Sequence, residues 1–186
     1  SWSKPVNPKT DRQTGARARI GLLGAAWAVE LTEEQRAGWN LYASNVPMKN
    51  RLGETMNISG FNQYCRTNGV LLAIGEDRID DAPGIFTLGE QDPSITVSVN
   101  SAAGEIELTF DTDADWVKED GAFLAVSVGR PVNKNVEFFG GPFRLAGHVS
   151  GSSTSAPTSP ATIESPWPLQ AGQRVFVQCR IVRADG

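Results

Sequence analysis

Three aspartates alternate along one short stretch of the chain, at Asp111, Asp113 and Asp115. Carboxylates spaced in this way in a loop can turn their oxygens toward a calcium ion. The EF-hand pattern, however, needs glycine at the sixth position and glutamate at the twelfth, where this sequence has Trp116 and Ala122. The three aspartates are therefore possible metal ligands, and the favoured alternative is a solvated acidic turn that uses Asp for local hydrogen bonds.

Candidates for nucleophilic or other metal chemistry are few. His148 is the single histidine, and Cys65 and Cys179 are the two cysteines, whereas a zinc site needs about four such ligands. The stretch Gly147–Gly151 approaches the nucleophile elbow of hydrolases, but its Ser150 stands one place late. The chain contains no phosphate-binding loop and no dinucleotide fingerprint. We predict a protein that is not an enzyme, with no catalytic residues and no cofactor, in which both cysteines are buried thiols that act as small apolar side chains.

The elements that carry these residues come from a chain of 186 residues, 40% apolar and 20% charged, as is typical of a soluble globular protein. No apolar run reaches the roughly 18 residues of a membrane span. The first residues also lack the charged and then apolar pattern of a signal peptide. We expect no membrane partner.

Charge is distributed unevenly along the chain. Residues 1–80 hold ten Lys/Arg against eight Asp/Glu, and residues 81–186 hold seven against thirteen. The first nineteen residues, the basic arm, contain five cations and one tryptophan that are candidate contacts with a partner: Trp2, Lys4, Lys9, Arg12, Arg17 and Arg19. Such an arm can bind an acidic protein surface or nucleic-acid phosphates, or it can be a solvated helix start. Because Trp2 and the prolines lower the entropy cost of ordering, we favour docking on a protein and rank nucleic acid lower.

Residues 1–80 have helical periodicity after the arm's first, proline-stiffened residues. Capping signals and apolar stripes predict three helices, over residues 10–30, 32–46 and 59–74. Their predicted buried stripes are Ile20, Leu23 and Trp27; Trp39, Tyr42 and Val46; Phe61, Cys65 and Leu72. Gly15, Gly21 and Gly24 each weaken the first helix by about 1 kcal/mol, so it needs a packing partner. The aromatic residues of these stripes could also form a ligand box, and we favour a core.

Residues 84–186 show period-two alternation, which indicates antiparallel strands. The alternating stretches are residues 95–99, 106–110, 123–128, 143–149 and 175–182, with an exposed loop at 150–160. The predicted fold is therefore α+β: a basic arm and a three-helix docking segment in residues 1–80, followed by an antiparallel immunoglobulin/fibronectin-like β-sandwich in residues 84–186.

Three phenylalanines cluster at Phe138, Phe139 and Phe143, around two glycines and a proline. Adjacent side chains on a strand point to opposite faces. One ring of the Phe138–Phe139 pair is therefore predicted to be exposed at a protein contact, and all three residues are candidate interface residues.

The chain contains a set of short stretches that are considered together: Asn7-Pro8-Lys9-Thr10 with Gln13, Arg17 and Arg19; Leu31–Asn40; Ser59–Asn62; Gly129–Pro131; and Phe138–Arg144. This series resembles small virion structural proteins of tailed-phage and prophage gene clusters, which pair a helical N-terminal segment with an immunoglobulin-like C-terminal domain. The resemblance implies a non-enzymatic component of the phage particle, assembled in the host cytoplasm, and it transfers no catalytic residue.

From this resemblance we expect a capsid decoration (cement) protein that attaches through its arm and helices. Its partners would be other virion proteins, above all the major capsid protein, and further copies of itself in a homo-oligomer such as a trimer. Two alternatives stay open. One is a tail or head–tail connector component, and the other is a glycan-binding adhesion module that stacks sugars on Trp116, Trp167 or Phe138.

Overall fold

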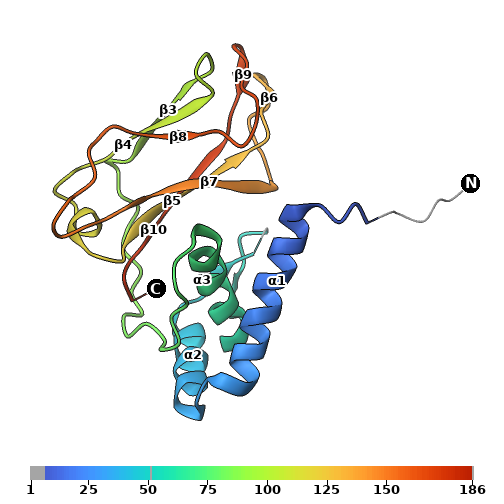
Figure 1. The fold of residues 1–186 in the computed structure, drawn as a ribbon, viewed down its shortest axis with the longest axis vertical. Helices are drawn as coiled ribbons and strands as arrows, with labels where there is room; N and C mark the ends of the chain where they lie inside the picture. Colours follow the sequence, from blue (N-terminus) through green and yellow to red (C-terminus); the bar gives the residue numbers. More distant parts are fainter. Residues whose placement is uncertain (1–6, 51, 186) are drawn as a thin grey trace, which may run out of the picture. The chain divides into compact units, whose positions relative to one another are not determined.

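The computed structural model describes residues 7–50 and 52–185 of the chain. The chain divides into two compact units, residues 1–88 with 185–186 and residues 89–184, which we call the helical unit and the β unit. The described residues combine three α-helices with antiparallel sheets and form no closed barrel (Figure 1). The predicted mixture of helices and antiparallel strands is confirmed at this level.

The helical unit contains three helices and one short ribbon: α1 Asp11–Ala25, continued by a π-helix Ala26–Glu30; α2 Glu33–Asn45; the strands β1 Met48–Lys49 and β2 Thr55–Met56; and α3 Gly60–Ile74. All three predicted helices are present. Thr32 and Gln35 exchange both hydrogen bonds of a capping box at the start of α2. Gly75 ends α3 with a φ of 92°, a left-handed conformation that glycine adopts without strain. The β1–β2 ribbon lies between the second and third predicted helices, in residues 48–58, where the sequence pattern predicts no helix or strand.

Aromatic rings form the core of the helical unit. Trp39 and Tyr64 have no exposed surface, and their rings meet edge to face with centroids 5.4 Å apart. Trp27 packs 5.6 Å from both Phe61 and Tyr64. Edge-to-face pairs add to the free energy of apolar burial. These rings pack against one another as a core, which was the favoured alternative to a ligand box.

The predicted stripe of α3 is displaced by one residue. Its most buried side chains include Tyr64, Asn68 and Leu71, whereas Cys65 and Leu72 are half-buried. The reason is that Tyr64 packs on Trp39 and that Asn68, although polar, is fully satisfied inside the unit. The predicted buried face of α3 was wrong by one residue because the prediction relied on side-chain polarity alone.

The segment that follows α3 is held against the helices by polar bonds. The amide of Asn68 donates to the carbonyl of Ile79 at 3.0 Å and accepts from its N–H at 2.6 Å. The indole N–H of Trp39 donates to the carbonyl of Asp80 at 2.8 Å, and Arg78 pairs with both Asp80 and Glu30. Buried polar groups with partners on both sides give a unit a single packing arrangement. Arg78 thus links Glu30, at the end of the π-helix, to the segment that follows α3.

The β unit contains eight strands and one short helix: β3 Thr96–Asn100, β4 Glu105–Thr109, a 3-10 helix Asp115–Lys118, β5 Phe123–Gly129, β6 Val132–Asn133, β7 Phe143–Ser150, β8 Ala161–Glu164, β9 Gln173–Arg174 and β10 Val177–Val182. Every predicted strand is present. The sequence predicts no strand at β8, because four residues with one large apolar side chain, Ile163, show too little alternation.

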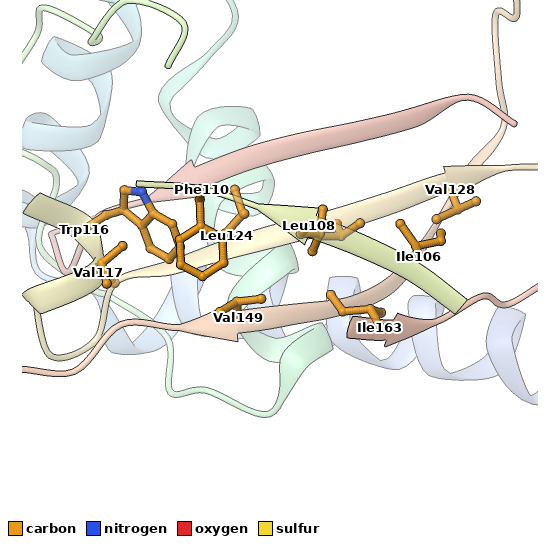
Figure 2. Close-up of a cluster of buried hydrophobic side chains, with 11 residues drawn as sticks. Ile106, Leu108, Phe110, Trp116, Val117, Leu124, Val128, Val149 and Ile163 are labelled. Carbon is orange, nitrogen blue, oxygen red and sulfur yellow. The ribbon is translucent and has the colours of Figure 1, made fainter. Parts of the chain in front are cut away.

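The strands of the β unit pair antiparallel throughout. One three-stranded sheet has the order β3-β4-β8 and the other the order β10-β5-β7, while β6 pairs with β9. Both three-stranded sheets contribute to one core, which consists of Ile106, Leu108, Phe110, Trp116, Val117, Ala122, Leu124, Val126, Val128, Val149 and Ile163. Figure 2 shows the labelled side chains gathered in one group along the strands.

Candidate functional site

Helix α1 packs very little of its surface against the rest of the helical unit. Of its fifteen residues, only Leu23 is buried. Ile20, predicted to lie in the buried stripe, is 52% exposed, and its neighbour Leu22 is 49% exposed. The prediction for Ile20 was wrong because α1 makes its core contact only near its C-terminal end, where Leu23 and Ala26 are buried.

The cations of the basic arm are available to a partner. Lys9, Arg12 and Arg17 are exposed and Arg19 is half-buried. Within residues 7–50 and 52–185, none of these four side chains forms an ion pair. Trp2 and Lys4, the other two predicted contacts of the arm, lie outside the described residues. An exposed cation without an internal ion partner can contribute to the attraction of an acidic surface.

Two glycines leave one part of α1 open. A Cβ added at Gly21 or at Gly24 would meet no atom of the described residues within 4 Å, so no contact among them requires glycine there. Glycine inside a helix costs roughly 0.5–1 kcal/mol relative to alanine. Helical propensity in α1 is thus lowered where the helix has little packing to compensate. We call Lys9 and five of the exposed residues of α1, Arg12, Arg17, Ile20, Gly21 and Leu22, the docking surface.

The three phenylalanines have different surroundings. Phe138 is 83% exposed, whereas Phe139 stacks on Phe176 at 5.7 Å and meets Phe143 edge to face at 5.3 Å. A Cβ added at Gly129 would lie 2.5 Å from the Phe139 ring, so this glycine makes room for it. The prediction that one of the adjacent rings is exposed is confirmed, and the exposed ring is Phe138.

The three aspartates are not arranged as ligands. Among the described residues, no group of three or more His, Cys, Asp or Glu side chains is placed to hold a metal ion. The Asp111 carboxylate accepts the N–H of Asp113 at 2.9 Å, and Asp113 pairs with Lys118 at 2.6 Å. That bond to Lys118 lowers the pKa of the Asp113 carboxyl. The geometry is that of the alternative, an acidic turn, with Asp115 at the start of the 3-10 helix.

Two of the three proposed sugar platforms are covered. Trp116 is 3% exposed and packs 5.1 Å from Phe110. The Arg144 guanidinium lies 3.5 Å above the centre of the Trp167 ring, a cation–π contact that occupies that face. Phe138 is the one platform left open.

His148 and the two cysteines make packing contacts or are partly buried within their own units. The His148 ring meets Phe123 edge to face at 6.0 Å. Cys65 and Cys179 are free and half-buried, and burial raises the pKa of both thiols. A raised pKa lowers the thiolate fraction and with it the reactivity.

Comparison of the chain with protein-family models, with curated proteins and with solved structures gives no match. Among the described residues, no helix has the length and the apolar character needed to cross a bilayer. The function must therefore be argued from the docking surface itself.

Proposed function

We propose that this chain is a non-enzymatic structural component of a tailed-phage particle, a capsid decoration protein that binds the major capsid protein through its basic arm and α1. The observation that carries the proposal is that α1 has one buried residue, and that its three arginines and the preceding Lys9 form no ion pair within the described residues. A three-glycine helix with so little packing gains stability when a partner covers it. The resemblance to virion proteins supplies the identity of that partner.

The proposal assigns different tasks to the two units. The helical unit binds the lattice, and the β unit, which we assign to the immunoglobulin-like sandwiches, projects from it. The shared core of the β3-β4-β8 and β10-β5-β7 sheets supports that assignment. Repeated sites on a particle multiply a modest affinity of each site when copies of the protein are linked.

Co-sedimentation with purified particles tests the proposal. Deleting residues 1–19 removes no buried side chain of the described residues, because the first one is Leu23, so the truncated chain should fold and fail to bind. A second variant reverses the charges of Arg12, Arg17 and Arg19 to Glu. Its matched control applies the same change of charge at three exposed cations elsewhere: Arg66, Arg130 and Lys134.

We expect both arm variants to lose binding and the control to keep it. Unchanged occupancy after deletion of residues 1–19 would refute docking through the arm. Counting copies per particle separates the two particle locations, since a decoration protein is present in hundreds of copies and a connector in a dozen or fewer.

A further inference from the structure

Strand β3 is an uncovered edge of its sheet. It stands at the end of the order β3-β4-β8, and all five of its residues are exposed. Val97 and Val99 lie directly opposite Leu108 and Ile106 of β4. Side chains directly opposite each other share a face of the sheet, and these two partners are fully buried core residues. The valines therefore lie on the core-facing side, yet they remain 39% and 41% exposed.

On its outer side, β3 pairs with no strand in the part of the chain that the structure describes. Asn100 accepts a hydrogen bond from the N–H of Gly104 at 2.9 Å, so its carbonyl points toward β4. Backbone groups of successive residues point to opposite sides of a strand. Ser98 therefore also faces β4, and the N–H and C=O groups of Val97 and Val99 face the free edge. An added strand would satisfy these groups and cover the valines.

The absence of charge on β3 suits a second copy of this chain as its partner. The β unit, residues 89–184, holds seven Lys/Arg against eleven Asp/Glu, so two copies carry a net charge of the same sign and approach each other best at an uncharged edge. Among the four edge strands of the two three-stranded sheets, β7, β8 and β10 contain charged residues and β3 contains none. β3 also lacks the proline, inward-pointing charge or bulge that protects edge strands.

The strand is also complementary to itself. Antiparallel pairing of β3 with a second β3, centred on Ser98, places Val97 of one copy opposite Val99 of the other. Each such pair exchanges both of its N–H···O=C bonds, and the four valines cover one another at the rim of the two cores. On the other face Ser98 meets Ser98, and Thr96 meets Asn100.

We propose that two copies of this chain pair through β3 and form one continuous sheet across a two-fold axis. The association is independent of the docking surface and gives a dimer, in place of the trimer considered from the sequence. Each dimer carries two docking surfaces, which is the linkage that avidity on a lattice requires.

Sedimentation velocity of the full chain over a wide concentration range tests the pairing. The wild-type protein should shift from monomer to dimer as its concentration rises. Val97→Pro removes an outward-facing donor, at a type of position where edge strands tolerate proline, and should weaken the dimer by at least about tenfold. Val99→Lys should do the same, whereas Val29→Lys, at an exposed valine of the helical unit, should leave the dimer unchanged.

Cross-linking tests the register. In this arrangement the two Ser98 Cα atoms form a non-hydrogen-bonded pair about 4.5 Å apart, within the range of a disulfide. Ser98→Cys should therefore link two copies rapidly under mild oxidation. Thr96→Cys is the matched control, because its two copies are offset by about 14 Å along the strands. The wild-type chain, with Cys65 and Cys179, measures the background.

Three results would overturn the proposal: a wild-type chain that stays monomeric at every concentration, a dimer that Val97→Pro leaves intact, or equal cross-linking at positions 96 and 98. Loss of the dimer on deleting residues 1–19 would also overturn it, because that result would show that the basic arm, and not β3, holds the two copies together. Particle binding of Val97→Pro monomers separates this test from that of the proposed function, which requires only the docking surface.

Discussion

Replacing Gly21 and Gly24 with alanine should change stability and particle binding in opposite directions. Both residues lie inside α1, and both have open space where the new methyl group would stand. Each replacement removes a helix penalty of roughly 0.5–1 kcal/mol. The double variant should therefore raise the free energy of unfolding of the helical unit by about 1–2 kcal/mol. For a unit of this size, 1 kcal/mol corresponds to about 4–8 °C in Tm.

The same methyl groups should interfere with docking. A partner that packs against α1 at its glycines approaches the helix axis closely, and two added methyl groups hold it away. Overpacking of a close contact costs about 1–3 kcal/mol, which is about 5- to 150-fold in affinity. Gly69→Ala is the matched control, because Gly69 lies inside α3 with equally open space and should raise stability without affecting binding.

Two assays measure the two effects. Thermal unfolding followed by circular dichroism at a helix wavelength gives the stability, and co-sedimentation with particles gives the affinity. A double variant that binds particles as tightly as the wild type would show that the glycine positions of α1 do not contact the partner. A double variant that is destabilised would show that α1 is packed at these positions in the free chain. Either result refutes the reasoning.

Two further predictions concern packing and ionisation. Burial, together with the nearby carboxylate of Asp80, raises the pKa of Tyr64 to about 12, so the free energy of unfolding should fall as pH rises from about 10, the ordinary tyrosine pKa, to about 12. Tyr64→Phe should abolish that part of the pH dependence in chemical unfolding; an unchanged slope would contradict the role of Tyr64. Phe139→Ala should cost about 2–3 kcal/mol by emptying the space beside Gly129, whereas Phe138→Ala, at an exposed ring, should change unfolding by less than about 0.5 kcal/mol; equal losses would show that Phe138 also packs.

Local signals in the sequence located the elements well. The Thr32–Gln35 capping box, the Ser59 cap and Gly75 mark helix ends through hydrogen bonds made within a few residues, so a linear pattern is sufficient to find them. The same holds for the strands, whose alternation reflects one buried face. The hairpin between β3 and β4 turns at residues 101–104.

Contacts between distant residues were not visible in the pattern. Ile20 fits a helical apolar stripe, but the structure leaves it exposed because none of the described residues covers that part of α1. Asn68 is polar and buried, because its partner Ile79 comes from a segment that the pattern leaves unassigned. For the docking surface, the cations were predicted from their density, whereas the open glycine positions required the geometry of α1.

Hydrogen–deuterium exchange of the chain, free and bound to particles, tests the docking account most directly. The amides of residues 11–22 should exchange quickly in the free chain, because this part of α1 is weakly packed, and should become strongly protected on the particle. The β unit should show no comparable change. Equal exchange of residues 11–22 in both states, with new protection confined to the β unit, would contradict it.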